Sequence, residues 1–215
     1  ATKDLGGKKV HAECIAAVRG AAQLCEDLGH IVEESSPPVD FAVLSDAFMA
    51  IWAAGLAQQV EVLEMMTGAK PSLKTMQGLT LGLYESGRKI SAGAYLNAVT
   101  MMQAAARAVA KWHQTHDVWL TPTLGAPPLK VGAVDTSQRD PKAAFAPMID
   151  YVPFTAIQNA TGQPAINLPL HWSKSGLPVG VQFVGRFGDE ATLLRLAAQL
   201  EKARPWKDKR PGLYG

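Results

Sequence analysis

The stretch that decides the fold runs from Tyr151 to Gly185 and reads YVPFTAIQNATGQPAINLPLHWSKSGLPVGVQFVG. A short helix is expected over 153–160, because proline favours the first turn of a helix. Two apolar runs at 164–168 and 179–184 predict strands, and the polar and glycine residues at 173–176 predict a turn between them. The segment therefore indicates a short helix followed by two successive strands.

Helices and short apolar strands alternate over the rest of the chain. Apolar residues near the 3.6-residue period predict a helix over 11–28, which Gly29 ends. Asp40 is a good N-cap for a helix over 40–66, and Asp189 for one over 189–204. The remaining expected elements are strands at 30–33 and 117–120, a helix over 91–114, short helices and loops over 67–88, and an extended excursion over 125–142. This alternation predicts the α/β class, with a mixed, largely buried sheet flanked by helices.

The composition excludes several classes of protein. The chain has 215 residues, of which 47% are hydrophobic and 19% are charged, and its formal net charge is +2. Such an apolar content excludes an intrinsically disordered chain. The balanced charge predicts no strong attraction to nucleic acid or to acidic membranes. The longest apolar run, 41–56, is interrupted by Ser45 and Asp46, so no membrane span of about 20 residues is expected.

The two cysteines indicate a reducing compartment. Cys14 and Cys25 lie eleven residues apart on one predicted helix, which separates them by roughly 16 Å. A disulfide requires Cα atoms closer than about 7 Å, so the two cannot pair with each other. Unpaired, apolar cysteines are typical of cytoplasmic proteins, and we therefore expect a cytoplasmic location.

Common catalytic and cofactor motifs are absent from the sequence. It contains no Gly-x-Ser-x-Gly elbow, no Gly-x-Gly-x-x-Gly run and no phosphate-binding loop. His113 and His116 have the spacing of two metal ligands on a helix, but histidines at a helix end also bind free carbonyl groups, and we favour this second interpretation. No metal and no cofactor are predicted.

Three polar residues on the short helix form the best candidate for a site. Thr155, Gln158 and Asn159 lie between Pro153 and Gly162, where small and cyclic residues let a neighbour or a ligand approach the backbone closely. The same pattern also suits a tight helix-to-strand junction with a capping side chain. The residues alone leave both interpretations open.

The segment resembles the C-terminal signature of the amidase signature family, a group of serine hydrolases. The residues that carry the resemblance are Pro153-Phe154-Thr155, Asn159, Thr161-Gly162, Pro164-Ala165, Pro169, Gly176-Leu177-Pro178, Gly180 and Gln182. Residues 190–201 are similar to the family's final helix. Upstream, 16–38 and 117–122 are similar to an earlier helix and to a buried strand that ends in Thr-Pro-Thr. The likeness thus extends over nearly the whole chain.

The resemblance implies hydrolysis of carbon–nitrogen (amide) bonds by a Ser–Ser–Lys triad. In the family those residues and a Gly-Ser-rich loop belong to an N-terminal half that this sequence lacks, so we expect 1–215 to be the C-terminal portion of a single amidase domain, inactive alone, with an extended tail at 203–215. No catalytic residue is carried over. The substrate-binding residues implied by the resemblance are Thr155, Gln158, Phe154, Asn159, Gln182 and Trp52.

The expected partners follow from this reading. They are a small-molecule amide substrate and the missing N-terminal half, with no nucleic acid and no membrane. Assembly of several copies remains open. The alternative is a non-catalytic assembly module, such as part of the A-type subunit of a tRNA-dependent amidotransferase. A half-length piece should also expose an unusually large apolar patch that the absent half would cover.

Overall fold

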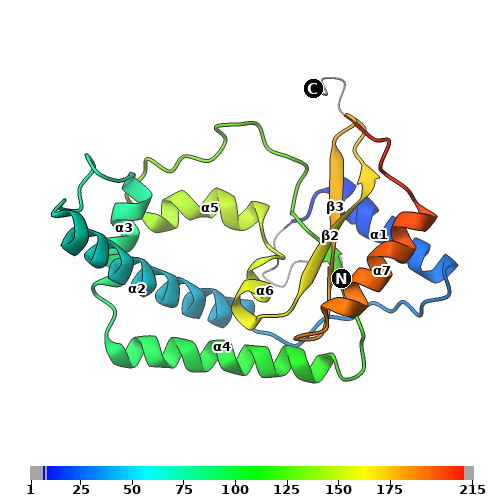
Figure 1. Ribbon diagram of the computed structural model, residues 1–215, viewed down its shortest axis with the longest axis horizontal. Helices are drawn as coiled ribbons and strands as arrows, with labels where there is room; N and C mark the ends of the chain where they lie inside the picture. The colour runs from blue at the N-terminus through cyan, green and yellow to red at the C-terminus, as the bar shows by residue number, and fades with distance from the viewer. Residues whose placement is uncertain (1–6, 8, 211–215) are drawn as a thin grey trace. The chain divides into compact units, whose positions relative to one another are not determined.

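The computed structural model describes residue 7 and residues 9–210 (Figure 1). Seven helices and three strands follow one another along this part of the chain. They are α1 (Ala12–Asp27), α2 (Phe41–Thr67), α3 (Gly78–Gly87), α4 (Ala92–Trp112), β1 (Trp119–Pro122), α5 (Pro141–Tyr151), α6 (Ala156–Thr161), β2 (Ala165–Trp172), β3 (Pro178–Val184) and α7 (Glu190–Ala203).

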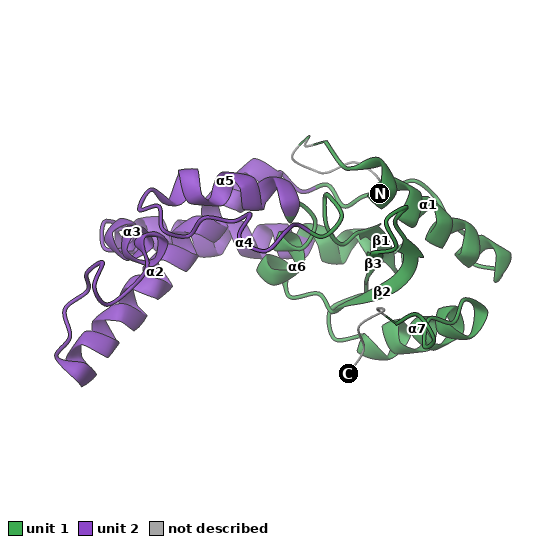
Figure 2. Cartoon of the chain, turned by 90° about the horizontal axis from the view of Figure 1, so that it is seen from above, with its two compact units in different colours: residues 1–38, 108–128, 152–215 green, residues 39–107, 129–151 purple. Residues whose placement is uncertain are grey.

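The chain forms two compact units, which Figure 2 colours separately. Unit 1 comprises 1–38, 108–128 and 152–215 and holds the sheet with α1, α6 and α7. Unit 2 comprises 39–107 and 129–151 and is helical, with α2, α3, α5 and most of α4. Both units combine segments that are distant in sequence.

The sheet of unit 1 has β3 at its centre, in the order β1-β3-β2, with both pairs antiparallel. The predicted turn at 173–176 joins β2 to β3, and Ser173 accepts a backbone hydrogen bond from Gly176 through its carbonyl oxygen (2.9 Å). A register irregularity interrupts β2 between Leu168 and His171, where Pro169 stands in the strand. The predicted α/β class and the helix-flanked sheet are therefore confirmed, and the three described strands are antiparallel.

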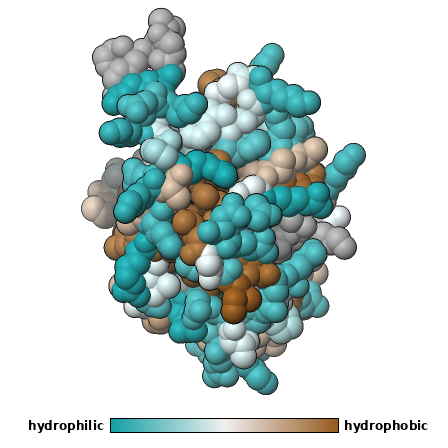
Figure 3. Space-filling model, turned by 90° about the vertical axis from the view of Figure 1, so that its right-hand side faces the viewer, coloured by the Kyte–Doolittle hydropathy of each residue, from teal (hydrophilic) through white to brown (hydrophobic). Residues whose placement is uncertain are grey.

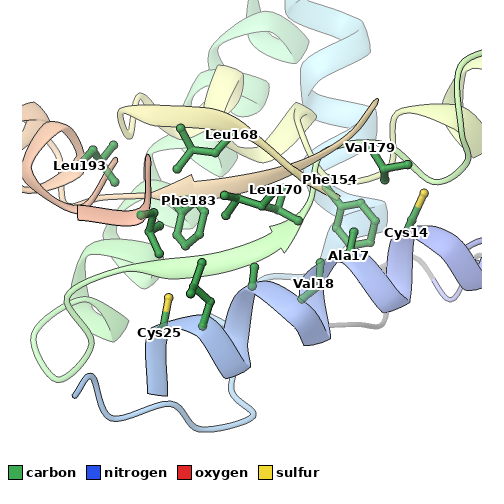
Figure 4. Packing of buried hydrophobic residues seen from close by; sticks show 14 of the residues in the cluster. Cys14, Ala17, Val18, Cys25, Phe154, Leu168, Leu170, Val179, Phe183 and Leu193 are labelled. Atoms are coloured by element: carbon green, nitrogen blue, oxygen red, sulfur yellow. The ribbon is translucent and has the colours of Figure 1, made fainter. Parts of the chain in front are cut away.

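Helix α1 packs against all three strands and forms the main core of unit 1. His11 caps α1, because its Nδ1 accepts a hydrogen bond from the backbone N–H of Glu13 (3.2 Å). Figure 4 shows the apolar side of α1 directed toward the sheet. The buried cluster includes Cys14, Ala17, Val18, Ala21, Cys25, Phe154, Leu168, Leu170, Val179, Val181, Phe183, Leu193 and Leu200. Both cysteines are free and buried, as the sequence predicts.

Unit 2 is built on close packing between α2 and α3. Asp40 caps α2, since its Oδ1 accepts hydrogen bonds from the N–H groups of Ala42 (3.0 Å) and Val43 (3.1 Å). A Cβ atom at Gly87, the last residue of α3, would overlap the backbone carbonyl of Ala53 on α2, so only glycine fits there. By length and composition alone α2 could cross a membrane, and 22% of its most apolar window is buried; core helices pass the same test.

Two sequence predictions about local structure are corrected. Residues 30–33 form no strand, because Ile31 is 98% exposed and no neighbouring strand pairs with this segment among the described residues. The segment at 125–142, expected to be an extended excursion, leads into helix α5 (Pro141–Tyr151). This helix is not predicted from the sequence, and it contains Pro147. Helix α5 contributes Phe145 to a small core with Ala53 and Leu83, so packing stabilises it despite the internal proline.

Large apolar side chains are exposed in both units. Figure 3 shows the side of the molecule that carries α1 and α7, where apolar residues lie among polar ones. Exposed apolar residues of unit 1 include Ile31, Leu177, Phe187 and Leu194, and those of unit 2 include Leu63, Met65, Met66 and Leu73. The expected single large apolar patch stays a prediction.

Candidate functional site

Helix α6 is bounded by Thr155 at its start and by Gly162 at its end. Thr155 occupies the N-cap position, is half-buried and makes no capping hydrogen bond with its side chain. Gly162 ends the helix in the left-handed conformation (φ 81°), and its N–H donates to the carbonyl oxygen of Gln158 (2.8 Å). Glycine adopts this conformation without the penalty that a Cβ atom brings.

The four candidates around α6 have different environments. Phe154 is 2% exposed and packs into the core between α1 and the sheet, so its side chain is structural in this chain. Asn159 lies on the exposed side of the helix. Thr155 is half-buried, and Gln158 is buried, with an exposed fraction of 7%. The structure therefore brings one core residue and three polar side chains together on one short segment.

The side chain of Gln158 is buried and makes no hydrogen bond within the described part of the chain. Among the described residues, neither Nε2 nor Oε1 of its carboxamide has a hydrogen-bond partner. The hydroxyl of nearby Thr161 lies within hydrogen-bonding distance of two acceptors, the carbonyl oxygen of Ile157 (2.7 Å) and Oε1 of Gln163, and its single hydrogen is shared between them. Buried polar side chains nearly always have partners, so this carboxamide is exceptional.

A polar row crosses the sheet on the face opposite α1. Thr121, Gln182 and Asn167 stand in register on β1, β3 and β2. Gln182 is 5% exposed, and its Nε2 donates to Oγ1 of Thr121 (3.1 Å). Thr123 donates its hydroxyl hydrogen to Oδ1 of Asn167 (2.5 Å). Gln182 is a candidate from the sequence alone, whereas its partner Thr121 is not; the Thr-Pro-Thr run at 121–123 was the available signal for Thr121.

Trp52 belongs to unit 2, whereas the other five candidates belong to unit 1. It is 41% exposed, and its ring contacts Phe145 (centroids 4.9 Å apart) and Phe48 (5.8 Å apart). These contacts are aromatic packing between α2 and α5. Its assignment to the substrate pocket stays a prediction.

Both histidines bind main-chain carbonyl groups, one in the last residue of α4 and one in the turn that follows it, in line with the favoured interpretation. Nδ1 of His116 donates to the carbonyl oxygen of Trp112 (3.1 Å), and Nδ1 of His113 to that of His116 (3.0 Å). His116 also stacks on Trp112 (centroids 3.9 Å apart) and places Nε2 2.7 Å from Oε1 of Glu33. Burial holds the pKa of His113 below its ordinary value. Within the described residues, no group of three or more metal-ligating side chains occurs.

Unit 2 contains a separate groove of about 600 Å³ between α2 and the start of α4. Arg88 and Glu61 form an ion pair at its wall (3.4 Å), and Ser91 caps α4 through a hydrogen bond from the N–H of Ala94 (3.1 Å). None of the six predicted site residues lines this groove. The lining residues are Ala54, Ala57, Gln58, Glu61, Gly87, Arg88, Ile90, Ser91, Ala92, Tyr95 and Leu96.

Known proteins with a similar sequence include an amidase and a cyclic-dimer hydrolase. AmiC of Mycobacterium leprae (strain TN), assigned as an amidase, is 34% identical over 203 residues, which are 93% of this chain and 43% of AmiC. The 6-aminohexanoate-cyclic-dimer hydrolase of Paenarthrobacter ureafaciens is 31% identical over 209 residues, which are 94% of this chain and 42% of that enzyme. A solved structure of 6-aminohexanoate cyclic dimer hydrolase matches 98% of this chain and 46% of its own, with a TM-score of 0.84 and 28% identity.

Two facts follow from these comparisons. The chain spans about two fifths of the length of the curated relatives that it matches. The family model described as Amidase matches residues 1–194, which include α6, the sheet and the polar row. The chain therefore belongs to the amidase family.

Proposed function

We propose that this chain is the C-terminal half of a hydrolase that cleaves amide bonds by a Ser–Ser–Lys mechanism. The observation that carries the proposal is the match of 98% of the chain, at a TM-score of 0.84, to an enzyme that hydrolyses a cyclic amide dimer. That match covers 46% of the enzyme's chain. The nucleophile, the second serine and the lysine are therefore assigned to the part of the parent protein that lies outside these residues.

The proposed mechanism assigns catalysis to the N-terminal half of the parent protein and substrate binding to the C-terminal half. In the proposed scheme, a serine attacks the amide carbonyl, the second serine relays its proton, and a neutral lysine acts as the base. Backbone N–H groups stabilise the oxyanion. In this scheme the C-terminal half binds and orients the substrate through Thr155, Gln158 and Asn159, and Phe154 fixes the start of α6 from the core. Gln182 and Trp52 complete the proposed set.

The substrate is proposed to be a small-molecule amide. A relative that is 31% identical is named for its action on the cyclic dimer of 6-aminohexanoate, which makes this compound the first one to test. The chain alone is proposed to be inactive, because binding geometry without a nucleophile cannot form an acyl intermediate. Its two free, buried cysteines support a cytoplasmic location.

A fluorophosphonate probe, which labels activated serines, tests this division. The parent protein should be labelled and should hydrolyse a panel of amides that includes 6-aminohexanoate cyclic dimer. The 215-residue chain should show neither labelling nor hydrolysis. Labelling of a serine within this chain would overturn the placement of the nucleophile, and a parent that hydrolyses no amide would overturn the proposed function.

A further inference from the structure

The groove in unit 2 has apolar walls that are open to solvent. On α2, Ala54 and Ala57 lie one helical turn apart on the face that lines the groove. On α4, the lining residues Tyr95 and Leu96 are 39% and 62% exposed. The volume of about 600 Å³ falls within the range of roughly 300–1,000 Å³ that is usual for small-molecule sites. The groove can therefore hold the hydrocarbon part of a small ligand.

Two opposite charges stand side by side at the wall of this groove. Nε of Arg88 lies 3.4 Å from Oε1 of Glu61, and their side chains are 60% and 51% exposed. An exposed ion pair contributes little to stability, so its contacts can be exchanged for contacts with a ligand at little cost. The other residues that line the groove are uncharged. The groove thus offers a ligand one cation and one anion.

Both charged groups retain unused hydrogen-bonding capacity. The guanidinium of Arg88 lies over the ring of Tyr84 (5.7 Å to the centroid), which favours one orientation of its plane. Beyond this contact and the ion pair, neither Arg88 nor Glu61 has a side-chain partner in the described part of the chain. A guanidinium can donate two parallel hydrogen bonds to one carboxylate, and a carboxylate accepts hydrogen bonds from an ammonium group. The pair can therefore bind one further group of each charge.

The charge balance of the groove restricts what that ligand can be. A carboxylate that binds Arg88 comes close to Glu61 and is repelled by it, and an amine that binds Glu61 is repelled by Arg88 in the same way. A ligand that carries both charges avoids both repulsions. In an α-amino acid the ammonium nitrogen and the carboxylate carbon each lie about 1.5 Å from one shared carbon. Its two charges are therefore about as close together as those of the protein's own pair.

We propose that this groove is a binding site for an α-amino acid with an apolar side chain. The carboxylate of the ligand binds Arg88, its ammonium group binds Glu61, and its side chain lies along Ala54, Ala57 and Leu96. The inference goes beyond the proposed function, because that function assigns no ligand to the groove and none of the six predicted site residues lines it. Amide hydrolysis and amino-acid binding are therefore tested separately.

Four probes test this assignment by NMR titration of the 215-residue chain and of the whole parent protein. L-Leucine carries both charges on one carbon and an apolar side chain. 4-Methylpentanoate lacks the amine, 3-methylbutylamine lacks the carboxylate, and 6-aminohexanoate carries the two charges at opposite ends of its chain. We expect leucine to shift the backbone amide signals of the groove saturably. The other three should bind about tenfold more weakly or not at all, because each loses a charged contact or places its charges too far apart.

Three variants separate recognition from folding. Arg88→Gln and Glu61→Gln should each weaken leucine binding about tenfold or more and leave the Tm close to that of the wild type, because both side chains are exposed. Glu61→Gln should also improve the binding of 4-methylpentanoate, and Arg88→Gln that of 3-methylbutylamine, since each change removes a repulsion. Arg107→Gln is the matched control, because Arg107 is an exposed arginine on α4 that does not line the groove. It should leave all four affinities unchanged.

Several outcomes would overturn the inference. Leucine that shows no saturable binding at millimolar concentrations, or binding that survives both Arg88→Gln and Glu61→Gln, would remove the site. 4-Methylpentanoate that binds the wild type as tightly as leucine would make the groove a simple anion site. Binding to the 215-residue chain that the parent protein lacks would show that the N-terminal half covers the groove. Any of these results leaves the proposed amide hydrolysis standing, because that activity is measured on the parent with other compounds.

Discussion

Gln182 at the centre of β3 donates a hydrogen bond from Nε2 to Oγ1 of Thr121 on β1 (3.1 Å), and both side chains are buried. The bond joins two strands on the face of the sheet opposite α1. Its loss would leave one carboxamide hydrogen without a partner in the interior, which costs more than the bond itself contributes.

Replacing Thr121 by valine should therefore destabilise the chain by about 1–3 kcal/mol. The double variant Thr121→Val, Gln182→Leu should recover much of that loss, because it removes both polar partners. Urea denaturation of the wild type, the two single variants and the double variant measures the coupling. Equal stability of Thr121→Val and the wild type would show that the hydrogen bond contributes nothing.

Gly87→Ala should destabilise unit 2, because the new Cβ atom would overlap the main-chain carbonyl of Ala53 on α2. Backbone cannot rotate away as a side chain can, and overpacking of this kind costs about 1–3 kcal/mol. The matched control is Gly55→Ala within α2, where nothing lies within 4 Å of the added atom. That change should stabilise the helix by roughly 0.5–1 kcal/mol. Thermal unfolding of both variants would detect opposite shifts in Tm.

His113 should make the stability of the chain depend on pH. Burial lowers the pKa of His113 below the ordinary value of 6.5. As the pH falls below 6.5, His113 therefore becomes protonated in the unfolded chain before it does so in the folded chain. The stability contribution is complete above about pH 6.5 and is lost as the pH falls below that value toward the folded-state pKa. His113→Asn, which keeps a donor near the position of Nδ1, should have a smaller loss between pH 7.5 and pH 5. Identical pH profiles for the two proteins would contradict this assignment.

The two cysteines should react slowly with thiol reagents in the folded chain. Burial, with a smaller effect of Glu26, raises the pKa of Cys25 to about 11, and burial with Glu13 raises that of Cys14. Because the thiolate is the nucleophile, little reactive form exists at pH 8. Ellman's reagent should react rapidly with both thiols when urea has unfolded the chain. In buffer without urea, it should react slowly with both. Fast release of chromophore from the folded chain would refute the inertness of these thiols.

Elements with a strong local signal could be predicted from the sequence. Asp40 and Asp189 mark helix starts, and both side chains accept the expected N-terminal hydrogen bonds. The strand expected at 179–184 agrees with β3 to within one residue, because a short apolar run after a turn is typical of a buried strand, and residues 181–184 are all buried. Capping and periodicity act over a few residues, so they can be read without knowledge of the fold.

The errors occurred where distant residues decide the structure. The run at Ile31 and Val32 has strand-forming side chains, but no strand in the described part of the chain supplies hydrogen bonds to it. Helix α5 contains Pro147 and forms because Phe145 packs against α2 and α3. The candidate site shows the same limit. The polar character of Gln158 was evident from the sequence, but its isolation from hydrogen-bond partners depends on the packing around α6.

The interruption of β2 has a consequence for how the protein behaves in concentrated solution. Sheets grow by accepting a new chain along an unprotected outer strand. Pro169 offers no N–H for such growth, and the irregular register between Leu168 and His171 bends the strand there. On the side of β2, Pro169 therefore opposes fibre-like stacking of one molecule on the next, and so does Arg204, whose Nη1 already donates to the main-chain carbonyl oxygen of Leu170 (3.2 Å).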